Sequence, residues 1–253
     1  MKIFRAASSE LDKKYVQQLA PAQASVQKAH NLAEFVVTKP WGSEYLISSH
    51  ETVEVWHLAI NYLHSTSMHC HPRKKTALVV LEGRALFSSL NNSMELGPLD
   101  GVVIDAGTFH CTQSVSTQGL RVLEFETPPI KHDLIRLEDK YGRANSGYEG
   151  ANFMVPIGTN FRLANQIGGR SLQFRNNLFY LANKNSPGWR KFKQDASGAM
   201  LGIVLRGPIK LGNQVFHTCD ILSSDELNLL KPDGKSSIFC LAAKNDQDLS
   251  VFA

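Results

Sequence analysis

The chain has 253 residues, of which 43% are hydrophobic, and this length and composition suffice for one large or two small domains with packed cores. The formal net charge is only +4, without a long run of like charges, which argues against a nucleic-acid or membrane-surface role. No apolar stretch is long enough for a membrane-spanning helix, and the first residues lack the apolar core of a signal peptide, so we expect a cytoplasmic protein.

The first expected element is helical. Ser9 can cap a helix in which Leu11 and Tyr15 begin an apolar stripe with a period of four residues. Pro21 then opens a second short helical stretch. An amphipathic helix must bury its apolar stripe, so we expect this N-terminal helical arm, residues 1–34, to pack on the outside of a barrel or in a dimer interface.

After the arm the composition becomes typical of strands. Apolar or alternating runs bounded by turn residues predict strands at residues 52–60, 77–81 and 120–126. In the last of these, Glu124 shares one face with its second neighbours, and Leu123 lies on the opposite face. The alternation leaves open which face turns inward, because an apolar leucine has the stronger claim on a core.

Three histidines form the most informative pattern in the chain. His69 and His71 are two residues apart in a strand-like segment, so their imidazoles can point to one side while Cys70 points away. His110 follows a second strand run and a glycine turn, and it can complete a set of three nitrogen ligands. An isolated histidine is more often solvent-facing than metal-binding, but three ligands with open coordination positions are typical of a catalytic metal site.

These segments resemble the two signature motifs of the cupin superfamily, whose members are small antiparallel β-barrels with a metal in the mouth. The resemblance implies His69, His71 and His110 as metal ligands. The first cupin motif also carries a glutamate, and here Thr76 stands in its place, so the carboxylate ligand is missing. We therefore expect one divalent transition metal, and the loss of a negative ligand favours zinc, iron or nickel over manganese.

Two flanking segments resemble a narrower family. Residues 39–44 and 137–143 look like the bracketing motifs of the type II phosphomannose isomerase cupins, which also form the C-terminal part of some mannose-1-phosphate guanylyltransferases. Between them, Lys74 falls where that family usually has an arginine. Leu63 and Leu99 replace the glycines that lead the two cupin motifs.

The second half repeats the rhythm of strands and turns after a boundary-like stretch at residues 144–152. Strands are expected at residues 171–181, 200–205, 209–213, 220–222 and 237–242. His217 is the only histidine here, so we predict a metal-binding cupin barrel at residues 35–150 and a second, degenerate barrel without metal ligands at residues 151–253. The predicted fold class is all-β, with two cupin jelly-roll barrels (a bicupin) and the short helical arm.

Side chains for catalysis and substrate binding follow from the same comparison. Glu124 matches a glutamate of the apparent relatives' closing strand, and it is the candidate catalytic residue for moving a proton between adjacent carbons of a sugar. Lys74 and Lys75 are the candidates for binding a phosphate, although paired lysines are often only a solvated turn. Trp41 and Tyr45 could stack on a sugar ring or belong to the core.

Three functions compete on these grounds. The first is a metal-dependent isomerase or epimerase-like enzyme of carbohydrate metabolism that acts on an anionic sugar or sugar phosphate. The second is a three-histidine, iron-dependent dioxygenase, because cupins that lack the glutamate occur among oxygenases. The third is a non-catalytic cupin that binds a sugar nucleotide or carbohydrate. We favour the first, and by analogy with cupins we expect a homodimer.

Overall fold

The computed structural model describes residues 1–23, 32–131, 133–143, 151–158, 172–174, 176–182, 192–194, 196–230 and 236–244. The chain divides into two compact units, Lys2–Arg162 and Leu163–Ala253. The division falls after Arg162 rather than after residue 150, and it places the predicted N-terminal arm in the first unit. Within the described residues, no helix has the length and apolar character needed to cross a membrane.

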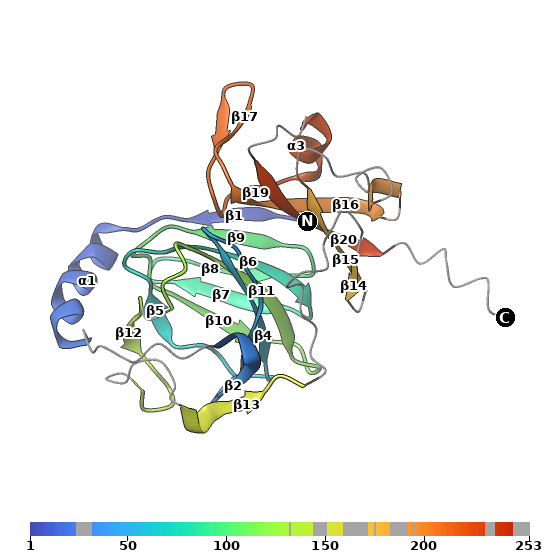
Figure 1. Ribbon diagram of the computed structural model, residues 1–253. Helices are drawn as coiled ribbons and strands as arrows, with labels where there is room; N and C mark the ends of the chain where they lie inside the picture. The colour runs from blue at the N-terminus through green and yellow to red at the C-terminus, as the bar shows by residue number, and fades with distance from the viewer. Residues whose placement is uncertain are drawn as a thin grey trace. The chain divides into compact units, whose positions relative to one another are not determined.

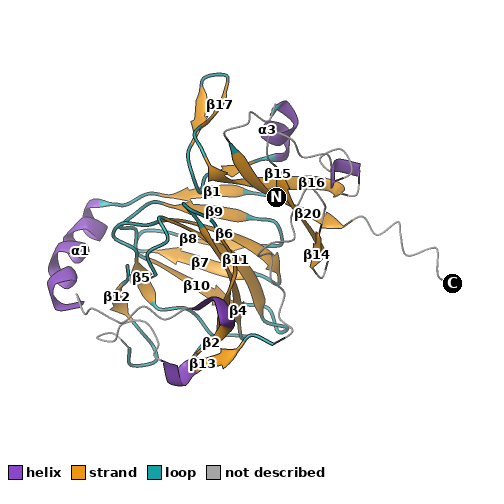
Figure 2. Cartoon of the chain, in the orientation of Figure 1, coloured by secondary structure: helices purple, strands orange, loops and turns teal. Residues whose placement is uncertain are grey.

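Two β-sheets build the first unit (Figures 1 and 2). The larger sheet has the strand order β1 (Ile3–Ala6), β9 (Gly101–Ile104), β6 (Lys75–Glu82), β11 (Leu120–Thr127), β4 (Glu54–Ile60), β3 (Gly42–Ser49), β2 (Phe35–Lys39) and β13 (Met154–Pro156). The smaller sheet has the order β12 (Ile135–Glu138), β5 (Met68–Cys70), β10 (His110–Ser114), β7 (Ala85–Ser89) and β8 (Ser93–Leu96). Among the described strands of this unit, only β1 and β9 pair in parallel, so these strands form the mainly antiparallel, all-β architecture that the sequence predicts.

The core of this unit lies between the two sheets. Leu58 and Val122 of the larger sheet pack in one apolar cluster with Phe87 and Leu96 of the smaller sheet. Inward-facing residues alternate along β6 and β11, as the period of a strand requires. The outer face of β11 is buried as well, because Leu123 is fully inaccessible to solvent.

Helix α1 (Glu10–Gln23) begins where the sequence predicts, at the Ser9 cap. The Ser9 hydroxyl accepts a hydrogen bond from the Asp12 backbone at 3.2 Å, and the Asp12 carboxylate accepts one from the Ser9 backbone at 2.8 Å. The helix continues through Pro21 to Gln23, so no break separates the two predicted helical stretches at Pro21, and most of the second stretch lies outside the described residues.

Helix α1 packs on the smaller sheet. Tyr15 contacts a small cluster formed by Cys70 and Phe109, which places Cys70 on the side of its strand opposite to the neighbouring histidines. The buried stripe of the helix includes Asp12, which accepts a hydrogen bond from the Phe109 backbone at 2.8 Å. Leu11 is 41% exposed, so it is not part of this stripe, contrary to the helical pattern.

The second unit contains a five-stranded antiparallel sheet in the order β14 (Leu172–Phe174), β15 (Asn177–Ala182), β20 (Ser237–Lys244), β16 (Ala196–Arg206) and β19 (Ile221–Leu222). A separate hairpin joins β17 (Ile209–Leu211) and β18 (Gln214–Phe216), and α3 (Ser224–Leu229) begins at a capping box of Ser223 and Glu226. Two short 3₁₀ turns, η1 (Leu32–Glu34) and η2 (Ala151–Phe153), lie in the first unit. The described strands of the second unit form one sheet and a hairpin, so the second barrel stays a prediction.

The two leucines that replace the leading glycines of the motifs retain a backbone conformation that suits glycine. Leu63 and Leu99 both have φ of 61°, in the left-handed region that costs an L-residue about 1–2 kcal/mol. Leu99 is buried, whereas the side chain of Leu63 is 60% exposed. At Leu63, therefore, the backbone cost is not offset by burial of the side chain.

We expect Leu63→Gly to stabilise the protein by up to about 1 kcal/mol, because the relief of the left-handed backbone exceeds the entropy that glycine adds to the unfolded chain. Urea unfolding followed by circular dichroism measures this change. Leu63→Ala is the control, since its Cβ keeps the same backbone cost and should give no gain. A Leu63→Gly variant less stable than Leu63→Ala would contradict the prediction.

Candidate metal centre

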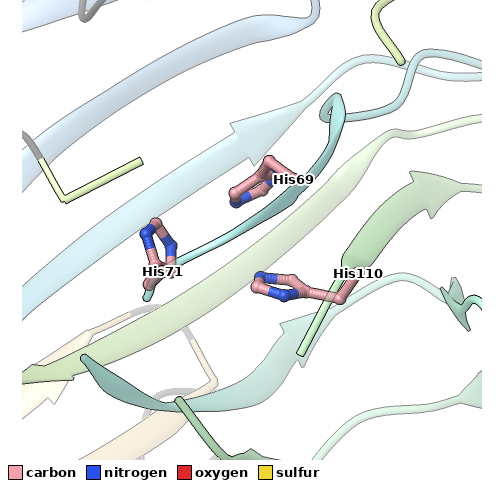
Figure 3. Close-up of side chains that lie close together, drawn as sticks. All are labelled: His69, His71 and His110. Carbon is pink, nitrogen blue, oxygen red and sulfur yellow. The ribbon is translucent and has the colours of Figure 1, made fainter. Parts of the chain in front are cut away.

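The structure brings the three predicted ligands together in the first unit (Figure 3). His69 lies on β5 and His110 begins β10, and the two residues are directly opposite each other in the antiparallel pair. His71 follows β5 by one residue. Ring centroids are 4.5 Å apart for His69 and His110, 5.0 Å for His69 and His71, and 5.6 Å for His71 and His110. One nitrogen from each ring lies within 4.8 Å of the other two, which is close enough for one ion.

Hydrogen bonds hold all three rings in the same tautomer. The Nδ1 atoms of His69, His71 and His110 lie 2.8, 2.6 and 2.9 Å from the backbone carbonyls of Ser67, Asp133 and Thr108. A carbonyl oxygen can only accept, so each Nδ1 carries the proton and each Nε2 keeps its lone pair. This arrangement is the usual outer support of metal-binding histidines.

The electrostatic environment keeps the three rings neutral. Burial lowers the pKa of His69 and His71 well below 6.5 and that of His110 to about 4. The Nε2 atom of His71 is buried without a hydrogen-bond partner. A buried acceptor of this kind needs a donor or a cation, so these residues fit a divalent transition metal, whose identity the ligand type leaves open.

Asp133 anchors the loop that carries His71. The buried Asp133 carboxylate accepts hydrogen bonds from the backbone of Arg73 at 2.7 Å and of Lys74 at 3.0 Å. Its backbone carbonyl is also the acceptor for His71 Nδ1. Asp133 therefore positions His71, although the two residues lie far apart in the sequence.

A cavity adjoins the histidines, and its lining is rich in charge. Five cationic side chains line it, together with three carboxylates. The cations are Lys39, Lys74, Lys131, Arg136 and Arg143, and the carboxylates are Glu44, Glu124 and Glu126. Four of these cations are paired with carboxylates, Lys39 and Lys131 with Glu44, Lys74 with Glu126 and Arg143 with Asp139. A small excess of positive charge remains, and a bound metal would add to it, so the cavity suits an anionic ligand.

Glu124, the predicted catalytic residue, lies in the wall of this cavity. Its side chain is buried, and burial together with the neighbouring Glu126 carboxylate raises the pKa of Glu124 to about 8, although Lys131 and Lys74 oppose the shift. The alternation of this strand leaves open which face turns inward, and the structure turns the face of Glu124 to the cavity. Both faces of β11 are buried, and only the face of Glu124 turns to the cavity.

The two predicted phosphate ligands have different surroundings. Lys74 is fully buried, and its Nζ lies 2.8 Å from Glu126 Oε1, so the interpretation as a solvated turn is wrong for it. Lys75 is half-buried, begins β6 and is not among the residues that line the cavity. Arg73 beside them is mostly exposed and pairs with Asp133 at 2.8 Å. Arg73, Lys74 and Lys75 thus do not form one cluster of positive charge.

Both segments that resemble the narrower family contribute to the cavity. From residues 39–44 come Lys39, Trp41 and Glu44, and from 137–143 comes Arg143. Trp41 is therefore placed to contact a ligand. Tyr45 does not line the cavity and packs against the His57 ring instead, with centroids 4.9 Å apart.

Several cavity residues escaped the sequence analysis. Arg136 is paired in register with His69, so it shares the face of a metal ligand. Lys131 lies 3.1 Å from Glu44 and 3.4 Å from the centroid of the Trp56 ring. Burial disfavours its charge, but the Glu126, Glu44 and Glu124 carboxylates outweigh burial and raise the pKa of Lys131. The alternation of residues along β11 indicates that Glu126 shares a face with Glu124, whereas no local sequence pattern indicates that Lys131 lines the cavity.

A second group of ligand atoms overlaps the first. Carboxylate oxygens of Glu124 and Glu126 and a ring nitrogen of His71 all lie within 4.8 Å of one another. Thr76, in the position of the expected glutamate, is buried and its hydroxyl has no hydrogen-bond partner. Carboxylates are thus present beside the histidines, although β6 does not supply one.

Fold and site together define an all-β protein whose three-histidine cluster can bind a metal. Neither a protein-family model nor a curated protein matches the chain. The solved structures that resemble it include a protein of the cupin superfamily, and the narrower phosphomannose isomerase family is not shown by these comparisons.

Three of these structures illustrate the extent of the similarity. A sugar phosphate isomerase of the cupin superfamily from Silicibacter pomeroyi is 16% identical, with 30% of this chain and 50% of that chain covered and a TM-score of 0.29. KdgF from Halomonas sp. is 14% identical, with coverages of 38% and 89% and a TM-score of 0.35. The capsular polysaccharide assembling protein CapF from Staphylococcus aureus is 17% identical, with coverages of 41% and 34% and a TM-score of 0.37. This chain spans half of the first protein's length, and at such scores the similarity carries no functional argument.

Proposed function

We propose that this protein is a metal-dependent enzyme that isomerises or epimerises an anionic sugar, such as a sugar phosphate. One observation carries the proposal: the buried Glu124 carboxyl, whose pKa is raised to about 8, shares a cavity with three metal-type histidines and an excess of cations. Groups with such perturbed pKa values concentrate at functional sites.

Substrate binding is assigned to the cations and the apolar wall of the cavity. Arg136 offers a planar guanidinium group that suits a phosphate or carboxylate, whereas the guanidinium of Arg143 is already paired with Asp139 at 2.6 Å. Trp41 provides an apolar surface for the sugar ring. The cationic groups orient the anionic end of the substrate and leave its carbonyl and hydroxyl groups toward the histidines.

Proton transfer is assigned to Glu124. A carboxyl group with a pKa near 8 is populated in both protonation states around neutral pH, so it can take a proton from one carbon and return it to another. A divalent metal on His69, His71 and His110 would polarise the sugar oxygens and so acidify the adjacent C–H bond.

The substrate class is tested by calorimetry and solvent exchange. Sugar phosphates and sugar nucleotides are titrated into metal-loaded and chelated protein, and deuterium incorporation from D₂O into each binding sugar is followed by NMR. Metal-dependent exchange at a carbon next to the carbonyl supports the proposal. Substrate-dependent oxygen uptake with bound iron would favour the dioxygenase, and equal binding after chelation without exchange would favour a binding protein.

We expect Glu124→Gln to lower the rate of this exchange about 10²–10⁴-fold, the usual contribution of a general base. Metal content and KM should change little, because glutamine retains the shape of the side chain and the change removes only the proton-accepting group. Full exchange activity in Glu124→Gln would exclude Glu124 as the base.

A further inference from the structure

Strand β11 pairs with β6 at Thr76, the position where the cupin motif has a glutamate. In the antiparallel pairing of the two strands, Glu126 lies directly opposite Thr76. Lys74 and Leu78 both line the cavity, and Thr76 lies between them on the same face of the strand. Directly opposed residues of antiparallel strands project to one face, so the Glu126 side chain projects over the short Thr76 side chain.

The Glu126 carboxylate is held at one oxygen and has no partner at the other. Oε1 lies 2.8 Å from Lys74 Nζ, whereas Oε2 is buried without a hydrogen-bond partner. His71 Nε2 and Thr76 Oγ1 are buried without partners as well. Two unpartnered acceptors, a carboxylate oxygen and an imidazole nitrogen, are unfavourable without a donor or a cation between them, and a metal ion satisfies both.

We propose that Glu126 joins His71 as a protein ligand of the metal, with Oε2 as its ligand atom, so that β11 supplies the carboxylate missing from β6. A carboxylate oxygen of Glu126 lies within 4.8 Å of a ring nitrogen of His71, and it reaches the ion shared with His69 and His110 when the Glu126 side chain turns toward them. This inference rests on the metal site of the proposed function. Lys74 is then a positioning residue, because it holds Oε1 and thereby aims Oε2, in the way that outer groups orient ligating carboxylates. Glu124 lies one inward-facing position away and stays available for proton transfer.

A carboxylate ligand from Glu126 would change which metal the site prefers. With three neutral imidazoles alone, the site favours zinc, iron or nickel, as the sequence suggests. An added carboxylate supplies a hard, negative oxygen, which strengthens binding of manganese relative to zinc. We therefore expect the protein to bind Mn²⁺ as well as Zn²⁺, and removal of this carboxylate should weaken Mn²⁺ more.

Metal titrations of the chelated full-length chain test the assignment, with Mn²⁺ followed by electron paramagnetic resonance and Zn²⁺ by competition with a chelating dye. Glu126→Gln should lower Mn²⁺ affinity by at least about 100-fold, the upper end of the effect of outer-shell partners. Glu124→Gln is the matched control on the same strand and face, and it should leave Mn²⁺ affinity nearly unchanged. The converse result, with Glu124→Gln weakening Mn²⁺ and Glu126→Gln not, would overturn the proposal.

Two double variants keep the test decisive. Thr76→Glu combined with Glu126→Gln moves the carboxylate back to β6, within the same pair of opposed positions, and should recover most of the lost Mn²⁺ affinity. Lys74→Met combined with Glu126→Gln removes both charges of the buried pair, so weak Mn²⁺ binding in this folded variant reports the missing ligand rather than an unpaired lysine.

The outcomes separate this inference from the proposed function. Wild-type protein that binds neither metal overturns both. Wild-type protein that binds Mn²⁺, with equal affinity in Glu126→Gln, overturns only the carboxylate ligand. Metal binding that depends on Glu126, without any sugar phosphate binding or exchange, supports the ligand assignment and overturns the proposed activity.

Discussion

Replacing His71 by alanine should reduce the metal content from close to one ion per chain to almost none. His71 Nε2 is buried without a hydrogen-bond partner and His71 Nδ1 is held by the Asp133 carbonyl, so Nε2 is the atom of this ring that can bind the ion, and alanine supplies no atom in its place. His69 and His110 then remain as the only nitrogens of the cluster, one fewer than the three protein ligands of a typical catalytic zinc site, and the nearby carboxylates group with His71 rather than with these two residues. Elemental analysis of protein purified without a histidine tag measures the loss.

The control for this result is His217→Ala. His217 is exposed in the second unit and, among the described residues, belongs to no group of potential metal ligands. Its replacement should leave the metal content at the wild-type value. Retention of the metal in His71→Ala, or equal loss in both variants, would show that the ion is bound elsewhere.

Replacing Lys74 by alanine should lower the free energy of unfolding of the chelated protein by about 3–5 kcal/mol, the cost of removing one partner from a buried ion pair. Both side chains of the Lys74–Glu126 pair are almost wholly inaccessible, at 0% and 2% exposure. The variant therefore leaves the Glu126 carboxylate as a buried, poorly compensated charge. Urea unfolding in the presence of a chelator measures the difference.

A matched exposed pair provides the comparison for Lys74→Ala. Arg84 and Glu95 lie 2.7 Å apart with both side chains 60% exposed, so Arg84→Ala should change stability too little to resolve. Added Mn²⁺ should restore part of the loss in Lys74→Ala, because the metal supplies a new partner for Glu126. Unfolding of Lys74→Ala at the wild-type urea concentration, with weaker sugar phosphate binding, would instead restore Lys74 to the role of a phosphate ligand.

The local patterns of the chain suffice for most of the strands and for the histidine cluster. Alternation and apolar runs locate β4, β6 and β11, and the spacing of His69 and His71 predicts that both rings project from one side of β5. These features depend on periods of two residues within a single strand. They can be recognised in the sequence because each strand must present one face to a core.

Helix α1 shows where such patterns fail. The spacing of apolar residues predicts Leu11 in its buried stripe, yet the buried position is Asp12, whose carboxylate satisfies both the Ser9 cap and the Phe109 backbone. A carboxylate is buried there because two backbone donors meet it. One of these donors, the Phe109 backbone, lies in a loop nearly a hundred positions away in the sequence. The pattern of hydrophobic residues along the helix therefore cannot predict that Asp12 is buried.

The carboxylates of the site depend on tertiary structure in the same way. The sequence shows that Thr76 stands where a ligand is expected and that Glu124 and Glu126 share a face. It does not show that Glu126 is opposite Thr76, because the register between β6 and β11 is a property of two strands far apart in the chain. Nor does alternation decide which face of β11 turns inward, since both faces are buried. Strand periodicity therefore predicts the nitrogen ligands, whereas pairing between distant strands places the carboxylates and cations around them.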